Sequence, residues 1–110
     1  MAKCQKILHH IHLLRFIKGT YLGEILIDGK RNIEALTITM ASEVTRTYKL
    51  VRVEQYPDEK DREAETETWY GAHNDLSLFG IDDVGRLPCF FIPEQKILVV
   101  NNVVMKKIEL

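Results

Sequence analysis

The chain has 110 residues, of which 45% are hydrophobic and 28% are charged, and its formal net charge is −1. This composition is typical of one globular domain, and so small a net charge excludes a global field that would draw the chain onto a polyanion or a membrane surface. Cys4 and Cys89 are too few for a disulfide framework, no N-terminal run has signal-peptide anatomy, and no stretch reaches the roughly 18 apolar residues of a membrane span, so we expect a cytoplasmic, reduced protein.

The first third of the chain has the pattern of strands that follow a short ambiguous segment. Residues 3–12 fit either a short N-terminal helix with one apolar face or the beginning of the first strand, because periodicity over so few positions does not decide. Apolar runs then predict strands over three ranges: 13–17, 20–28 and 34–42.

An Asp-Gly pair joins the second and third of these runs. Asp28-Gly29 lies between two apolar-rich segments, which indicates a hairpin because glycine accepts the positive φ angle that the turn requires. Gly23 lies within the second run, where a glycine weakens strand pairing and predicts a bulge or a sharp bend. A bend of this kind lets a small sheet curl.

The second half of the chain gives weaker patterns. A fourth, half-exposed strand is predicted over 47–55, where apolar and charged residues alternate. Acids outnumber bases over 58–67, which predicts a solvated loop with almost no structural role. Residues 68–88 mix aromatics with turn formers and receive no assignment. Two short closing strands are predicted on either side of Pro93 to Gln95.

These elements together predict a mainly β fold. Five or six short strands in one small domain are typical of a curled sheet or a small, strongly bent antiparallel barrel. We expect a single domain over residues 1–110, with an acidic loop inserted around 55–68 and an optional short N-terminal helix.

The hairpin carries a resemblance to a known family. Gly19, Gly23, Asp28 and Asn32 occur in that order, and the Asp and Asn are four positions apart. The chain thereby resembles the Sm-like (SH3-like) small-barrel proteins, most of all the short Sm-like proteins that tailed phages encode. In that family the first motif is a glycine turn, a glycine-bent strand, and an Asp followed four positions later by an Asn. The two glycines are one position closer here than is usual.

The second Sm-like motif is a strand, a very tight turn and a last strand, and the segment FFIPEQKILVV fits that outline. Lys30 stands where many family members have a stacking residue, and Ile92-Pro93-Glu94 stands in place of an Arg-Gly pair. The resemblance covers residues 13–39 and 88–101.

The resemblance implies a ring that binds single-stranded RNA at its pore. The Asp-to-Asn loops of such rings face the pore, where side-chain amides contact base edges and basic residues contact phosphate. The candidate RNA-binding residues are then Asp28, Lys30, Arg31 and Asn32. The alternative is that Asp28-Gly29 is only a turn and that Lys30 and Arg31 are solvated.

A cyclic homo-oligomer is expected on a second ground. The closing segment KILVVNNVVM reads as a long apolar strand whose edge must be covered, and Sm-like rings cover it by pairing with the next subunit. The alternative is that the N-terminal segment covers this edge within the chain.

No other constellation indicates chemistry. Cys4, His9, His10 and His12 lack the spaced ligand pairs of a structural zinc site, and His73, Asp75 and Ser77 lack the setting of a catalytic triad. We therefore expect no metal, no cofactor and no enzymatic activity.

Two functions stay open from the sequence. One is a ring-forming, RNA-binding Sm-like protein, located in the host cytoplasm if a phage encodes it. The other is a non-enzymatic interaction or assembly module of phage origin that binds a host or phage protein and no nucleic acid. The near-neutral charge favours the second, and the preserved Asp-to-Asn spacing favours the first.

Overall fold

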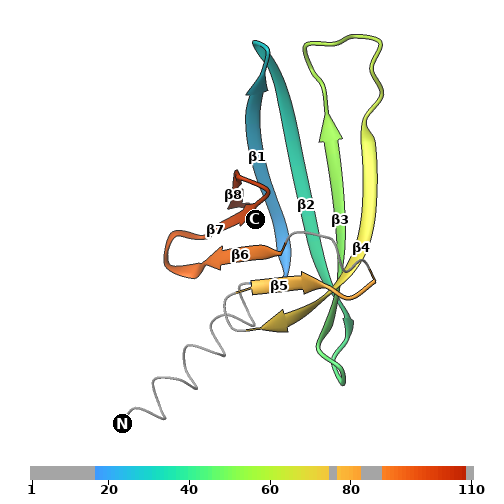
Figure 1. Ribbon diagram of the computed structural model, residues 1–110, viewed down its shortest axis with the longest axis vertical. Helices are drawn as coiled ribbons and strands as arrows, with labels where there is room; N and C mark the ends of the chain where they lie inside the picture. The colour runs from blue at the N-terminus through green and yellow to red at the C-terminus, as the bar shows by residue number, and fades with distance from the viewer. Residues whose placement is uncertain (1–16, 75–76, 83–87, 109–110) are drawn as a thin grey trace.

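The structure, a computed structural model, describes residues 17–74, 77–82 and 88–108. It is a closed barrel in which each strand pairs antiparallel with the next and the last pairs with the first (Figure 1). The described strands are β1 (Gly19–Ile27), β2 (Lys30–Ser42), β3 (Thr47–Gln55), β4 (Glu65–Asn74), β5 (Ser77–Gly80), β6 (Cys89–Ile92), β7 (Ile97–Val100) and β8 (Val103–Lys107), and a 3-10 turn lies at Pro93–Gln95.

The expected mainly β fold and small antiparallel barrel are confirmed. The described residues contain eight strands rather than five or six. The difference arises in the segment that received no assignment, which supplies most of β4 and all of β5, and at the end of the chain. The helix expected over 3–12 and most of the strand expected over 13–17 fall outside the described residues.

Two tight turns, between β1 and β2 and between β7 and β8, use residues with positive φ angles. Asp28 and Gly29 have φ angles of 53° and 76°, so both central residues of the β1–β2 turn are left-handed, as in a type I′ turn. Asn101 and Asn102 have φ angles of 50° and 64° and make the same kind of turn between β7 and β8. The segment expected as one long closing strand is therefore a hairpin, because two successive asparagines tolerate this conformation.

The edge of the last strand is covered within the chain. Tyr21 and Leu22 of β1 pair with Lys107 and Lys106 of β8, and the backbone N–H of Ile108 donates to the carbonyl of Thr20 at 2.9 Å. One of the two grounds for expecting a ring was that this edge would be free. That ground for a ring is removed, and the ring itself stays a prediction.

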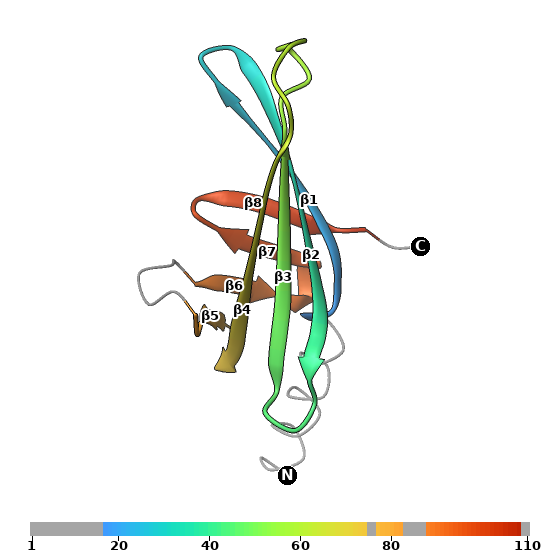
Figure 2. The same ribbon diagram turned by 90° about the vertical axis from the view of Figure 1, so that its right-hand side faces the viewer.

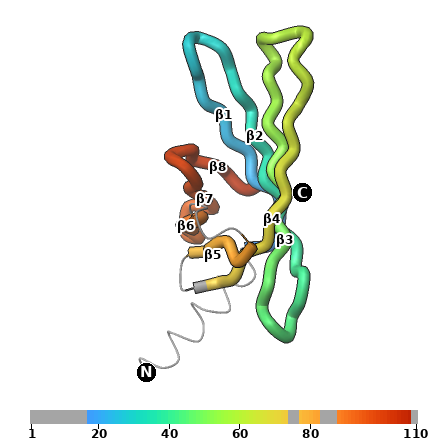
Figure 3. The backbone as a smooth tube through the Cα atoms, turned by 45° about the vertical axis from the view of Figure 1, so that its right-hand side comes forward, coloured from blue at the N-terminus to red at the C-terminus, as the bar shows by residue number. Residues whose placement is uncertain are grey.

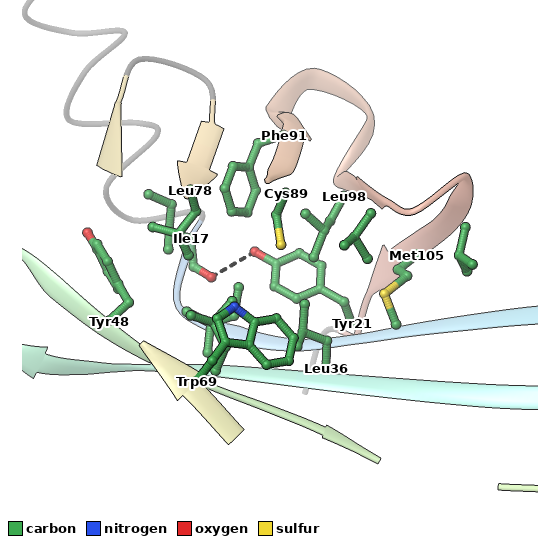
Figure 4. Packing of buried hydrophobic residues seen from close by; sticks show 14 residues of the cluster. Ile17, Tyr21, Leu36, Tyr48, Trp69, Leu78, Cys89, Phe91, Leu98 and Met105 are labelled. Carbon is green, nitrogen blue, oxygen red and sulfur yellow. Dashed lines mark hydrogen bonds between the residues drawn. The ribbon is translucent and has the colours of Figure 1, made fainter. Parts of the chain in front are cut away.

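The core lies where the long strands β1–β4 cross the short strands β5–β8 (Figure 4). The Tyr21 ring lies among apolar side chains, and its hydroxyl donates to the carbonyl of Ile17 at 2.9 Å. Burial raises the pKa of this hydroxyl. The Tyr21 ring is tilted 59° to that of Phe91, with centroids 6.3 Å apart. A buried phenol with a hydrogen-bond partner is well tolerated, so Tyr21 fixes the start of β1 in the core.

Gly23 has a different role from the one expected. The β1–β2 register runs through Gly23↔Glu34 without a shift, and the irregularity in β2 lies between Met40 and Ser42. A Cβ at Gly23 would lie 2.9 Å from Cγ1 of Val103 and 3.0 Å from the carbonyl oxygen of Val104. The expectation of a bulge at Gly23 is therefore wrong, and the alternative of a sharp bend stays a prediction. Glycine is needed there because β8 crosses β1 too closely for a side chain.

The first four strands are longer than the last four and extend beyond the barrel. Figures 1 and 2 show the β1–β2 hairpin and the β3–β4 loop projecting at the same end of the molecule, away from β5–β8. The tube in Figure 3 shows the same two hairpin ends above the barrel. The sheet face that packs on the core therefore continues past it.

We expect Gly23→Ala to destabilise the protein. The added methyl group must displace Val103 or the β8 backbone, and overpacking of this kind costs about 1–3 kcal/mol. Urea unfolding followed by circular dichroism measures the change. Thr39→Ala, at an exposed position of β2, is the control and should change the free energy of unfolding by less than about 0.5 kcal/mol. An unchanged midpoint for Gly23→Ala would contradict the close crossing.

Candidate functional site

The inner sheet face changes from apolar to charged as it leaves the barrel. Ile38, Leu50 and Trp69 are directly paired across β2, β3 and β4, and all are buried in the core. Because side chains alternate along a strand, the residues four positions toward the projecting end lie on the same face. They are Glu34, Glu54 and Glu65, and the register pairs these three carboxylates across the same three strands.

Glu34 is the most buried charged side chain of this row. It is 4% exposed, and its Oε2 atom has no hydrogen-bond partner in the structure. Nη2 of Arg52 lies 3.8 Å from Oε1 of Glu34 and 3.1 Å from Oε2 of Glu54, so one guanidinium serves two carboxylates. Burial raises the pKa of Glu34 above its ordinary value; Arg52 opposes this rise, and Glu54 and Glu67 add to it.

Asn32, the last of the predicted RNA-binding residues, points into this face. It is 7% exposed, and its Nδ2 donates to Oε1 of Glu54 at 2.8 Å. The amide is therefore part of the polar network that includes Glu54 and Arg52. Its neighbour Asp28 is exposed and forms the left-handed first position of the turn.

The two predicted basic residues bind the β3–β4 loop. The backbone N–H of Arg31 donates to Oδ2 of Asp58 at 2.8 Å, and Nη2 of Arg31 donates to Oδ1 at 2.9 Å. Nζ of Lys30 lies 3.6 Å from Oε1 of Glu59. Hydrogen bonds from Arg31 hold the pKa of Asp58 below its ordinary value. The loop was expected to have almost no structural role, and this was wrong, since it is tied to the β1–β2 hairpin.

A hollow of about 460 Å³ lies between the two hairpin ends. The Arg62 guanidinium lies 3.5 Å from the centroid of the Tyr56 ring and 3.0 Å from Oε2 of Glu59, so an aromatic ring, a cation and a carboxylate are stacked at one wall. Other residues of the lining include Asp28, Asn32, Glu54 and Glu65.

The projecting end is strongly acidic although the chain is almost neutral. We define the acidic end as residues 23–34 and 52–67. It contains ten Asp and Glu side chains and five Lys and Arg side chains, a net charge of −5 in a chain whose total is −1. The remainder of the sequence therefore carries a net charge of +4. Among the described residues outside the acidic end, there are six Lys and Arg side chains and three Asp and Glu side chains, a net charge of +3.

The structure brings the four predicted residues to one hairpin and shows what sequence reasoning missed. Glu34, Arg52, Glu54 and Asp58 complete the site. The excess of acids after Pro57 was a sequence signal for Asp58 alone, and nothing in the local pattern pointed to the other three. Cys4, the three N-terminal histidines and Asp75 fall outside the described residues.

Two further observations concern the described residues. They contain no group of three or more His, Cys, Asp or Glu side chains arranged to hold a metal ion. None of their helical segments is both long and apolar enough to span a bilayer.

The chain matches no family model, no curated protein and no solved structure. The resemblance of residues 13–39 and 88–101 to Sm-like proteins therefore stays a prediction.

We expect Glu34→Gln to stabilise the protein at pH 7, by on the order of 1 kcal/mol, because it removes a buried carboxylate with an unpartnered oxygen. The folded-state pKa of Glu34 is raised, so between the unfolded-state pKa and the folded-state pKa the folded state binds more protons than the unfolded state. The free energy of unfolding therefore falls as the pH rises through this window. The advantage of the variant should shrink as the pH falls through this window. Urea unfolding at several pH values tests this, with the exposed Glu43→Gln as control; a destabilised variant at pH 7 would contradict it.

We expect Asp58→Ala to release the β3–β4 loop from the β1–β2 hairpin. The Arg31 amide loses its acceptor, so its hydrogen exchange and that of residues 56–64 should accelerate. The pKa of Asp58 is lowered, so this tether is complete above the ordinary carboxyl pKa and is lost as the pH falls through the depressed value. Hydrogen–deuterium exchange measures the change. Asp61→Ala, in the same loop, is the charge-matched control, and equal effects of the two variants would argue against the tether.

Proposed function

We propose that the protein is a non-enzymatic protein-interaction module whose acidic end binds a basic segment of a partner protein. The observation that carries this proposal is the row Glu34–Glu54–Glu65, three carboxylates paired directly across adjacent strands at the border of a hollow. Like charges directly opposite one another destabilise a sheet. A sequence that keeps them at a position where folding alone favours neutral residues indicates a use for the charge.

Arg52, the cation that lies among the three carboxylates of the row, does not balance their negative charge. Arg52 is shared between Glu34 and Glu54, and Glu65 is exposed, with Nη2 of Arg62 3.8 Å from its Oε1. A guanidinium or ammonium group that enters the hollow would meet Glu54 and Glu65 together. It would reduce the repulsion along the row and gain the attraction of several carboxylates at once.

The same geometry disfavours RNA as the ligand. Lys30 and Arg31 are paired with Glu59 and Asp58, so a phosphate would have to displace a carboxylate to reach either cation. The amide of Asn32 is hydrogen-bonded to Glu54. A polyanion would also approach the end of the molecule that carries a net charge of −5, against the electrostatic attraction on which nucleic-acid binding depends.

The test is a fluorescence-anisotropy titration of the full chain with a labelled Arg- and Lys-rich nonapeptide and, separately, with labelled oligo-U, each over a salt series. We expect the peptide to bind and to lose affinity with salt. The double variant Glu54→Gln and Glu65→Gln should weaken peptide binding about tenfold or more.

A matched control separates the site from general acidity. Glu43→Gln with Glu94→Gln removes the same charge at exposed positions away from the acidic end and should leave the peptide affinity within about twofold. Equal losses in the two double variants would contradict a specific site. Oligo-U binding that Lys30→Glu abolishes, without peptide binding, would replace the proposal with the RNA function that the Sm-like resemblance implies.

A further inference from the structure

We infer that the hollow of the acidic end is a site for an arginine side chain of the partner, and that Arg62 occupies this site when no partner is bound. The inference deepens the proposed function and rests on it. The Cζ atom of Arg62 lies 3.5 Å from the centroid of the Tyr56 ring, and both residues line the hollow of about 460 Å³. A guanidinium group therefore already lies on the aromatic wall of this hollow.

The contacts of Arg62 indicate which cation the site selects. Nη1 of Arg62 lies 3.0 Å from Oε2 of Glu59, and Nη2 lies 3.8 Å from Oε1 of Glu65, so the two terminal nitrogens face two different carboxylates. The carbon between these nitrogens is in contact with the face of the Tyr56 ring. A lysine ammonium is a single point charge and cannot contact the ring and two separated carboxylates in this way. The site therefore favours arginine over lysine.

The ring is held in place, whereas the cation on it has room to leave. Tyr56 is 5% exposed, and the side chain of Arg62 is 46% exposed. Burial raises the pKa of Tyr56, and a hydrogen bond to Glu65 adds to the rise, so the phenol is fixed at its hydroxyl as well as by packing. Arg62 can turn toward solvent and leave the ring where it is.

The position of the β3–β4 loop does not depend on Arg62. Lys30 and Arg31 form the tether between the loop and the β1–β2 hairpin by binding two carboxylates of the loop. The contacts of the Arg62 side chain are with residues of the segment 56–65 itself. An exchange of Arg62 for an arginine of the partner therefore leaves the tether intact.

The carboxylates around the hollow can accept a further cation. Its lining contains four carboxylates and two cations, which are Asp28, Glu54, Glu59 and Glu65 against Lys30 and Arg62. Beside Glu54 on the inner face, Glu34 is 4% exposed and its Oε2 atom has no partner in the structure. Because Arg62 stays attached to the loop after it is displaced, binding adds one cation to this end and reduces the repulsion among the carboxylates.

The experiment is fluorescence anisotropy of the full chain with two labelled nonapeptides that differ only in having arginine or lysine at every basic position. We expect the wild type to bind the arginine peptide about fivefold more tightly. Arg62→Ala removes the competing guanidinium and should tighten binding of the arginine peptide by about fivefold or more. Lys60→Ala removes the same charge from an exposed position of the same loop and should change this affinity by less than about twofold.

Two substitutions at Tyr56 test the aromatic wall. Tyr56→Phe keeps the ring face and should keep the preference for the arginine peptide, whereas Tyr56→Leu should remove it. Circular dichroism checks that both variants keep the fold. The comparison of Arg62→Ala with Lys60→Ala leaves the buried ring unchanged, so it decides the inference even where Tyr56→Leu does not fold.

The outcomes separate this inference from the proposed function. Equal affinity for the two peptides, or an Arg62→Ala variant that binds the arginine peptide no more tightly than Lys60→Ala does, would overturn the inference and leave the proposed function standing. Binding of neither peptide to the wild type or to Arg62→Ala would overturn both.

Discussion

The site depends on one constraint, which is the alternation of side chains along strands that extend beyond the closed part of the barrel. At the row of Ile38, Leu50 and Trp69, the inner face of β2–β4 is covered by β5–β8 and must be apolar. Beyond that cover the same alternation continues, and the strands place Glu34, Glu54 and Glu65 on the same face with no change of register. A barrel that closed at its full strand length would have to bury three opposed carboxylates, which is prohibitive. Partial closure leaves them at a border where the charge is tolerated but still costly.

Two electrostatic effects of opposite sign meet at this border. Asp58 is stabilised in its charged form by Arg31, and this pair fixes the β3–β4 loop against the β1–β2 hairpin. Burial destabilises the charged form of Glu34. Arg52 offsets this effect only in part, since it is shared between Glu34 and Glu54. The loop contacts therefore tie together the two segments that border the hollow, while Arg52 alone faces both Glu34 and Glu54 of the carboxylate row. Such an arrangement, rigid around a destabilised group, is typical of binding sites and uncommon in surfaces that have only a structural role.

Local patterns in the sequence predicted local structure well. The Asp28-Gly29 turn and the range of β3 follow from turn chemistry and alternation, and both are confirmed. The sequence did not predict what depends on distant pairing. That Arg31 binds Asp58 and that Glu34 lies opposite Glu54 requires the β2–β3 register, which no single segment encodes. The role of Gly23 was missed for the same reason, since it depends on the position of Val103 in the last strand.

The hairpin geometry also explains why an Asp-to-Asn spacing can recur without a shared function. A two-residue turn with both φ angles positive favours Asp followed by Gly, which places Asp28 at the tip whatever the protein binds. From that turn, alternation places Asn32 on the inner face opposite Ile25, where a short polar side chain can reach Glu54 on the adjacent strand. Both residues of the motif are accounted for by the turn and by the register. The spacing therefore reports on how the hairpin folds, and the ligand must be argued from the charges around it, which at this end of the molecule are mainly negative.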